Sequence, residues 1–397
     1  MPGTLLALLQ FSFALTWVVY VIYLPGLVEQ AGLERRYVPM ILLLDQVLFL
    51  ACDWAAGVYA DRVARKFGRI GGRMAIIALV SCFAFMALPW VAPGSAKAFL
   101  VVIVIWSVTS SVLRAPSLAI ASRHTSSASQ GWVPCAFLFG LGAASAIAPY
   151  LAVELRQFDP RVPFAIASIA LAAFVVALAR VERTHAPVAS EASSPVQARR
   201  VSMALFAFVV LLFAFGFQVH FTINSAQGYL RFATTDDLPK LMPVFWIGFN
   251  VALVPAMLLA NRFGGAATMV TAGVIGVLAL IGCARAPSLV PLIVAQSFAG
   301  VAWSIALMSA FTAALEAGRP GREGLLTGVL FSTLAAASIA RLAIFIAGLQ
   351  SHAVIGPRLE NVPFIAWALA AFLMALVAYP ERARAAGPAP PSHPGAR

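Results

Sequence analysis

Long apolar stretches alternate with short polar segments along the whole chain. Twelve of these stretches hold about 20 apolar residues each, enough for a helix to cross about 30 Å of hydrocarbon. The predicted spans cover residues 4–24, 38–60, 71–91, 98–122, 131–153, 162–180, 202–226, 240–260, 265–284, 288–315, 323–349 and 361–379. The pattern therefore predicts an all-α, polytopic membrane protein with twelve transmembrane helices.

Two polar segments divide the chain. Residues 181–201 are rich in Ala, Ser, Pro and Arg, and a tail with a Pro-Ala-Pro-Pro run begins at Glu381. Both compositions are typical of solvated, disordered chain. We therefore expect an N-terminal six-helix bundle (1–180), a cytoplasmic linker (181–201), a C-terminal six-helix bundle (202–380) and a disordered cytoplasmic tail (381–397).

Two short motifs recur at nearly the same offset. Ala60-Asp61-Arg62 returns 200 residues later as Ala260-Asn261-Arg262, and Trp106-Ser107 returns 197 residues later as Trp303-Ser304. Each pair occupies corresponding positions in the two sets of six spans. The recurrence predicts two pseudo-symmetric bundles that face each other across a central cavity.

Composition and charge agree with a membrane protein. Hydrophobic residues make up 61% of the chain and charged residues 11%, with a net charge of +12. With both termini inside, the inner loops and tail carry 16 Lys and Arg against 6 Asp and Glu, and the outer loops carry 9 against 7. This asymmetry follows the positive-inside rule, so the net positive charge reflects membrane topology and is not evidence of nucleic-acid binding.

Signatures of other protein classes are missing from the sequence. There is no phosphate-binding Gly-Lys-Ser/Thr loop and no nucleophile elbow, and the four cysteines lie inside spans without metal-ligand spacing. We therefore expect neither an enzyme nor an ATP-driven pump, no metal and no organic cofactor.

A dense basic loop joins the second and third spans, and its key positions are Gly57, Asp61, Arg62, Arg65, Lys66, Gly68 and Arg69. Gly57 permits close approach of another helix, and Asp61 at a helix end can meet the N-terminal dipole of a neighbouring helix. The basic residues can anchor at anionic headgroups. Such a loop can hold one face of the two bundles closed; alternatively, it serves only to set topology.

This loop resembles the loop between the second and third helices of major facilitator superfamily transporters, and its spacing is similar to that of the glycoside-cation symporters and plant sucrose carriers. The resemblance implies a solute carrier. In those symporters, acids stand at the positions of Asp53 and Asp45, and further acids stand at the positions of Phe49 and Arg114. Because one of the two replaced acids helps to bind sodium there, protons are the expected coupling ion here.

Four charged residues lie inside predicted spans away from their ends: Asp45, Asp53, Arg114 and Arg341. Such groups are expensive in hydrocarbon unless they are paired or hydrated, so they are candidates for function. Their charges sum to zero, which predicts ion pairs across the cavity. The pairs either fix the helices permanently, or they couple proton binding to solute binding when Asp53 or Asp45 takes up a proton. We favour coupling, and Arg114 is the first candidate to bind an anionic solute directly.

Further polar and aromatic residues are candidates to line the cavity. His220, Asn224 and Gln227 recur at i, i+4 and i+7, which predicts one polar stripe facing the cavity, with Gln218 slightly off it. His220 is either a second proton site or a hydrogen-bonded structural residue. The remaining candidates, which core packing explains equally well, are Trp17, Tyr20, Trp106, Trp246, Asn250 and Trp303.

Together these features favour a monomeric, proton-coupled secondary transporter in a bacterial-type inner membrane, with both termini cytoplasmic. The two arginines favour a small organic anion, and a neutral sugar is the alternative that the loop resemblance raises. A non-transporting assembly factor with the same fold is the competing class, and a membrane-embedded transferase is a third. The expected partners are the solute and the lipid bilayer, without nucleic acid.

Overall fold

The fold was analysed in a computed structural model that describes residues 2–67, 69–126, 129–184, 203–318 and 321–385. Every regular element in these residues is a helix, so the predicted all-α class is confirmed. A helix forms its backbone hydrogen bonds within itself, and a segment that crosses a bilayer must do so because lipid offers no partners.

The first six spans are built from seven α-helices. These are α1 (Pro2–Gln30), α2 (Val38–Phe67), α3 (Gly71–Val91), α4 (Ala96–Ser110), α5 (Ala115–Arg123), α6 (Trp132–Glu154) and α7 (Arg161–Thr184). The fourth span is discontinuous, because the short helix η2 (Ser111–Leu113) separates α4 from α5. Single 3₁₀ turns lie in the connections at η1 (Arg35–Tyr37) and η4 (Leu155–Gln157).

The second set of spans contains two further interruptions. Its helices are α8 (Met203–Val219), η5 (His220–Asn224), α9 (Ser225–Leu230), α10 (Leu238–Leu241), α11 (Pro243–Phe263), α12 (Gly265–Arg285), α13 (Leu289–Ala317), α14 (Glu323–Ile346) and α15 (Val362–Ala385). The seventh span runs through α8, η5 and α9, and the eighth runs through α10 and α11. The 3₁₀ helices η6 (Thr235–Asp237), η7 (Leu349–Ser351) and η8 (Gly356–Glu360) lie in loops.

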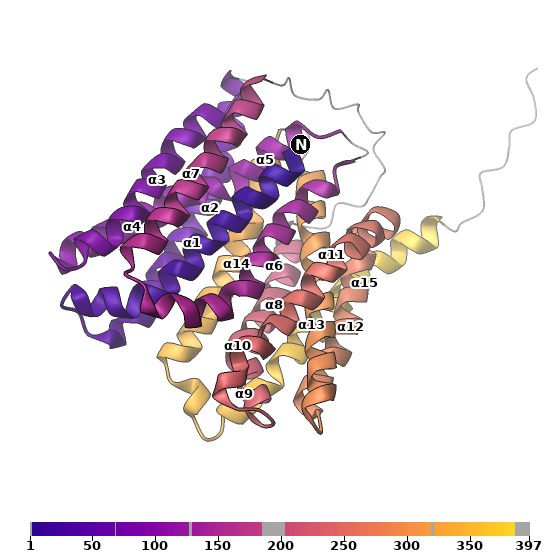
Figure 1. Ribbon diagram of the computed structural model, residues 1–397. Helices are drawn as coiled ribbons and strands as arrows, with labels where there is room; N and C mark the ends of the chain where they lie inside the picture. Colours follow the sequence, from indigo (N-terminus) through magenta and orange to yellow (C-terminus); the bar gives the residue numbers. More distant parts are fainter. Residues whose placement is uncertain (1, 68, 127–128, 185–202, 319–320, 386–397) are drawn as a thin grey trace, which may run out of the picture.

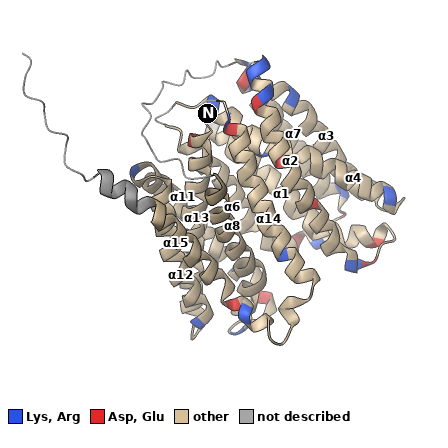
Figure 2. Ribbon diagram, turned by 180° about the vertical axis from the view of Figure 1, so that it is seen from behind, with Lys and Arg blue, Asp and Glu red and all other residues tan. Residues whose placement is uncertain are grey.

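The lengths of these helices fit a membrane. Among the described residues, eleven helical segments are long and apolar enough to cross it, and the twelfth, in α15, has a shorter apolar part, Val362–Val377. Lys, Arg, Asp and Glu gather towards the helix ends, while the middles of the helices are largely free of charge (Figure 2).

Two predicted boundaries differ from the structure. Residues 181–184 continue α7 instead of starting the linker, and residues 381–385 continue α15 instead of starting the tail. Glu182 explains the first difference, because its carboxylate accepts hydrogen bonds from the N–H groups of Ile70 and Gly71 and so caps the start of α3. The Glu-Arg-Ala-Arg-Ala sequence explains the second, because these residues favour helix once the chain has left the apolar layer. The rest of the predicted linker and tail lies outside the described residues.

The helices form two groups that lie side by side, α1 to α7 and α8 to α15 (Figure 1). The groups meet chiefly where α14 packs on α2 and where α11 packs on α6. The two recurring motifs take part in these contacts in corresponding ways. Asp61, at the end of α2, reaches the start of α14, and Asn261, at the end of α11, lies beside Gly131 at the start of α6.

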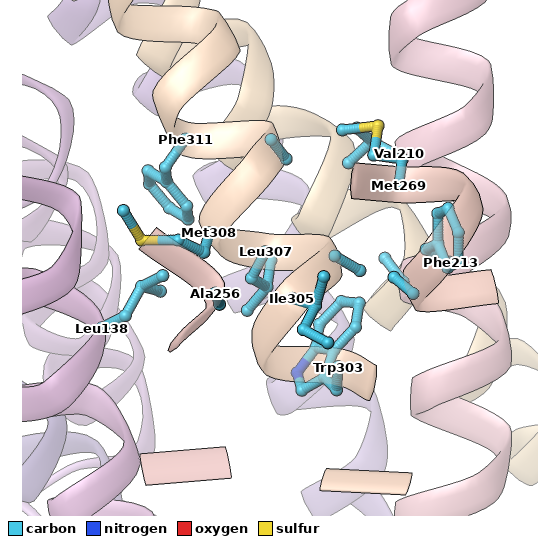
Figure 3. Packing of buried hydrophobic residues seen from close by; sticks show 14 of the residues in the cluster. Leu138, Val210, Phe213, Ala256, Met269, Trp303, Ile305, Leu307, Met308 and Phe311 are labelled. Atoms are coloured by element: carbon cyan, nitrogen blue, oxygen red, sulfur yellow. The ribbon is translucent and has the colours of Figure 1, made fainter. Parts of the chain in front are cut away.

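The largest apolar cluster surrounds α13. Ile305, Leu307, Met308 and Phe311 of this helix pack among side chains from α8, α11 and α12, and Leu138 of α6 belongs to the same cluster (Figure 3). The core therefore extends from the C-terminal group of helices into the N-terminal group.

Candidate functional site

The fourth span breaks at Arg114. This residue lies between η2 and α5 with φ −101° and ψ −93°, outside the helical region. Pro116 follows two residues later and has no N–H to donate to a carbonyl one turn back, so the helix cannot continue smoothly through this point. The break places the Arg114 side chain against α2.

Arg114 forms an ion pair with Asp53. Its Nη2 lies 2.9 Å from Asp53 Oδ1, and the two side chains are 13% and 0% exposed. The guanidinium also stacks on Phe49, with Cζ 4.0 Å from the ring centroid, and Nη2 lies 3.4 Å from Ser111 Oγ. Within the described residues, neither Asp53 oxygen has a well-aligned hydrogen bond. Asp53 is therefore neutralised mainly by the nearby charge of one guanidinium.

Asp45 lies two helical turns from Asp53 and has different partners. Tyr20 donates its hydroxyl hydrogen to Asp45 Oδ2 at 2.9 Å, and Ser107 donates to Oδ1 at 2.6 Å. Asp45 and Tyr20 are fully buried. The prediction that Asp45 belongs to an ion pair is wrong for the conformation described here, because two hydroxyl donors from α1 and α4 occupy its oxygens and no described cation lies within 4.0 Å.

Arg341 is the fourth intramembrane charge, and it has no acidic partner among the described residues. Its Nε is buried and has no hydrogen-bond acceptor there. The expected arrangement of two ion pairs is therefore wrong, because, of the two intramembrane arginines, only Arg114 pairs with an acid in the described part of the chain. Asp45 and Arg341 therefore have no salt-bridge partner among the described residues.

Asp61, Arg123 and Glu323 form a charged cluster between the two groups of helices, which we call the latch. Asp61 accepts hydrogen bonds from the backbone N–H groups of Gly324 at 3.0 Å and Leu325 at 2.7 Å, at the start of α14. Arg123 places Nη2 2.9 Å from Asp61 Oδ1 and 3.3 Å from Glu323 Oε2. An acid thus meets the N-terminal dipole of another helix, the contact that the sequence predicts for Asp61.

Three glycines let α2 and α14 touch beside the latch. A Cβ added to Gly57 would overlap the carbonyl oxygen of Gly324, and one added to Gly328 would lie 2.6 Å from Asp53 O. Real side chains do not tolerate such distances, so these positions need glycine for backbone contact. The predicted role of Gly57 in close helix approach agrees with this geometry.

The other loop residues contact the latch less. Arg65 donates from Nη1 to Gly321 O at 3.2 Å and so adds one further bond between the groups. Arg62, Lys66 and Arg69 are exposed, as expected for residues that set topology or meet headgroups. Gly68 lies outside the described residues.

The polar residues of the seventh span share one face only in part. The chain turns as a π-helix over η5, and the wider turn displaces every later residue around the helix axis. His220 is buried with Nε2 2.9 Å from Gln296 Oε1, Asn224 donates to a backbone carbonyl before α15, and Gln227 is exposed. His220 and Asn224 line one small pocket together with Gln296, so the predicted common face holds for these two residues and is wrong for Gln227.

Gln218, before the π-helix, bridges two spans. Its Nε2 donates to Ser338 Oγ of α14 at 2.9 Å, and both side chains are half-buried. His220, by contrast, belongs to a closed network, since Gln296 donates in turn to Ser225 Oγ at 3.2 Å and Ser225 donates to His220 O at 3.0 Å. This geometry matches the hydrogen-bonded structural role for His220 more closely than an exposed proton site.

The predicted aromatic residues divide into two groups. Trp17, Tyr20 and Trp106 lie together, with the Tyr20 and Trp106 rings 4.6 Å apart, and Tyr20 of this group donates to Asp45. Trp303 stacks on Phe217 at 4.5 Å, and Trp246 lies 5.8 Å from the same ring. Trp17 and Phe217 are half-buried, and the other four rings are buried.

Asn250 lies at the second contact between the groups of helices. Its Nδ2 donates to Trp246 O at 2.8 Å, and a Cβ added to Gly142 of α6 would lie 2.7 Å from Asn250 Oδ1. The side chain therefore packs between α11 and α6, where it fills space rather than facing an open cavity.

Sequence reasoning missed Arg123 and Glu323 of the latch. Both were counted only as loop charges, yet Glu323 stands in the first turn of a predicted helix and Arg123 ends the fourth span on the same side as Asp61. Charges at the ends of spans on one side of the membrane are the signal that could have identified them. Ser107 and Gln296 were also missed, since a buried hydroxyl or amide inside a span carries little pattern of its own.

A family model described as Major Facilitator Superfamily matches residues 6–342. The chain belongs to the major facilitator superfamily. The superfamily match confirms the recognition made from the loop residues, while the symporter and sucrose-carrier branch stays a prediction. A search of curated proteins found no match in sequence.

Solved structures of the major facilitator superfamily share this fold. The chain is similar to the human organic anion transporter MFSD10, with 15% identity, a TM-score of 0.69, and coverage of 95% of this chain and 98% of that one. It is also similar to the transporter FucP in an outward conformation, with 14% identity, a TM-score of 0.68, and coverage of 95% of this chain and 98% of that one. A third similar structure is the proton:xylose symporter XylE bound to 6-bromo-6-deoxy-D-glucose, with 12% identity, a TM-score of 0.66, and coverage of 95% of this chain and 93% of that one. At these identities the comparisons establish the transporter fold, and the site must be argued from this chain's own residues.

Proposed function

We propose that the protein is a proton-coupled secondary transporter that moves a small organic anion across the inner membrane by alternating access. It acts as a monomer with both termini in the cytoplasm and needs no cofactor other than the coupling proton. The observation that carries the proposal is the buried ion pair between Asp53 and Arg114.

This pair links proton binding to a moving contact. A proton on Asp53 removes the carboxylate charge and leaves Arg114 without a counter-ion, which is costly in a buried site. The backbone of Asp53 touches Gly328, so the same residue belongs to the contact between α2 and α14. A change in the charge of Asp53 therefore bears directly on whether the two groups of helices stay together here.

The latch supplies the second part of the mechanism. In the conformation described, Asp61 and Arg65 bond to α14 and to the segment before it, so the two groups are joined on the side that carries the basic loop. Access from that side requires these bonds to break and the glycine contacts to separate. Rocking of two helix groups about a central site is the usual form of such a cycle.

The free guanidinium of Arg341 favours an anionic solute. Arg341 is the intramembrane cation without an acidic partner among the described residues, and a negatively charged ligand would compensate it. The structural neighbours include an organic anion transporter and a sugar symporter, so the fold accommodates both kinds of solute.

Uptake into liposomes tests this function. Purified protein would be reconstituted and offered radiolabelled monocarboxylates, dicarboxylates and neutral hexoses, with and without an imposed pH gradient. We expect gradient-driven accumulation of a carboxylate above the level of protein-free liposomes. Accumulation of a hexose alone would favour a sugar symporter, and no flux of any solute would favour the non-transporting assembly factor.

A further inference from the structure

We propose that Arg341, together with Ser338 and Gln218, forms the subsite that holds the anionic group of the solute, and that this solute is a monocarboxylate. The inference rests on the proposed transport function and assigns the contact to Arg341 instead of Arg114. It follows from the orientation, the depth and the unsatisfied state of one side chain.

Arg341 lies on the face of α14 that is turned towards the seventh span. Ser338, one turn before it, accepts a hydrogen bond from Gln218 of α8. Ile344, one turn after it, packs against Val219 and Ile223. Because residues three apart on a helix share a face, Arg341 is flanked on both sides by contacts to the seventh span, and it does not point into lipid.

The register of α2 and α14 sets the depth of Arg341. The two helices run antiparallel, with Gly324 against Gly57, Gly328 against Asp53, and Ser332 bonded to Leu50 O. Arg341 follows Gly328 by 13 residues, which is about 20 Å along a helix axis. Arg114 is held at the level of Asp53, so the two arginines lie too far apart to grip one small anion.

Arg114 is also chemically occupied. Its guanidinium is paired with Asp53 and stacked on Phe49. A solute anion could reach it only after Asp53 has taken up a proton, whereas Arg341 has no acidic partner among the described residues in the conformation shown. The expectation that Arg114 binds the solute directly is therefore replaced by a binding role for Arg341.

The surroundings of Arg341 define the chemistry of the ligand. A guanidinium presents a planar fork of N–H donors that matches a carboxylate. The Ser338 hydroxyl, one turn before Arg341 on α14, and the Gln218 amide that donates to it from α8 supply neutral hydrogen-bonding groups. A single cation flanked by neutral hydrogen-bonding groups, with Arg114 out of reach, fits a ligand that carries one negative charge, a monocarboxylate.

Ligand-induced stabilisation provides the test. The melting temperature of the purified, full-length protein would be measured with lactate, benzoate, succinate and glucose, for the wild type and for Arg341→Lys, Arg341→Gln and Arg285→Gln. Arg285 is exposed at the end of α12, so its substitution removes the same charge outside the subsite. Binding only to the folded state raises the melting temperature by mass action.

We expect benzoate or lactate to stabilise the wild type and Arg285→Gln equally. Arg341→Lys should need at least a tenfold higher concentration for the same shift, and Arg341→Gln should show none. An undiminished shift in Arg341→Gln overturns the subsite, and so does a wild type that no monocarboxylate stabilises. Arg341→Lys keeps the positive charge, so it still tests the subsite if Arg341→Gln does not fold.

Uptake by the same variants separates this inference from the proposed function. If the protein transports a solute and Arg341→Gln transports it with unchanged affinity, the subsite is wrong and the transporter stands. If neither the wild type nor any variant moves a solute, both fail together.

Discussion

The guanidinium carbon of Arg114 lies 4.0 Å from the centroid of the Phe49 ring. These two residues occupy the positions at which the resemblance to glycoside-cation symporters expects acids. In place of a cluster of carboxylates that could coordinate sodium, the chain holds its own cation against an aromatic ring and one remaining acid, Asp53. This arrangement supports the proposal of proton coupling, because a proton needs only one carboxylate.

The ion pair predicts an asymmetric response to its two single substitutions. Asp53→Asn leaves a buried guanidinium that cannot lose its proton, and we expect a loss of about 3–5 kcal/mol in the free energy of unfolding at pH 8. Arg114→Gln leaves a carboxylate that can take up a proton, so its loss should be smaller at pH 5 than at pH 8. Unfolding in detergent at the two pH values measures both.

A double-mutant cycle completes that test. The variant Asp53→Asn with Arg114→Gln removes both charges, and its loss should be less than the sum of the two single losses. Additive losses would mean that the two side chains do not interact, contrary to the 2.9 Å contact.

The stacking of Arg114 on Phe49 predicts a smaller effect. Phe49→Leu keeps the ion pair but removes the ring face, and we expect about 1–2 kcal/mol of additional destabilisation relative to the matched variant Phe13→Leu, whose ring centroid is 5.7 Å from the guanidinium. In an Arg114→Gln background the difference between the two variants should disappear. A difference that persists there would assign the effect to packing alone.

The latch predicts a change in accessibility on one side of the protein. Asp61→Asn removes the charge that bonds the start of α14 and pairs with Arg123, and a loss of about 2 kcal/mol would shift the balance between open and closed states roughly 30-fold. Thr327 is fully buried between Gly324 and Gly328 in the sequence of α14, so Thr327→Cys in a cysteine-free background reports opening by its rate of alkylation. We expect Asp61→Asn to raise this rate strongly.

Arg62→Gln is the matched control for the latch, because Arg62 is a neighbouring charge that is exposed. When Arg62→Gln is combined with Thr327→Cys, the introduced cysteine should be alkylated at the same rate as in the parent protein that carries Thr327→Cys alone. Equal rates in Asp61→Asn and the parent would show that the carboxylate does not hold the contact closed.

The glycine contact predicts that a single methyl group blocks transport. Gly57→Ala places a Cβ on the Gly324 carbonyl and should prevent α2 and α14 from closing, which lowers the rate of solute uptake by an order of magnitude or more while the protein remains folded. Gly72→Ala, where an added Cβ meets no atom within 4 Å, should transport normally. Normal uptake by Gly57→Ala would show that closure does not require this contact.

The fold was readable from sequence because its signals are local. The helices follow from runs of apolar residues, and Asp61 at the end of one such run already indicated contact with a helix N-terminus. Partners in three dimensions were harder to assign. Asp45 was expected to meet an arginine, but nothing in the pattern shows that Tyr20 and Ser107 reach it first. The π-helix at His220 was also invisible, because one extra residue in a turn leaves composition and hydropathy unchanged.

The depth of Arg341 illustrates the same limit. Counting the charges inside spans suggested two neutral pairs, because the count ignored how deep in the membrane each residue lies along its span. The register of α2 against α14, set by Gly57, Gly324 and Gly328, places Arg341 about 20 Å beyond Asp53. Only that register separates the cation held by Asp53 from the cation left for a solute.

The most direct test of proton coupling through Asp53 is transport by Asp53→Asn in liposomes, measured in two modes with the same solute. The account predicts that accumulation driven by a pH gradient is lost, while exchange of labelled for unlabelled solute at equal concentrations continues. Gradient-driven accumulation that survives in Asp53→Asn would contradict it, and so would loss of exchange in a protein that remains folded.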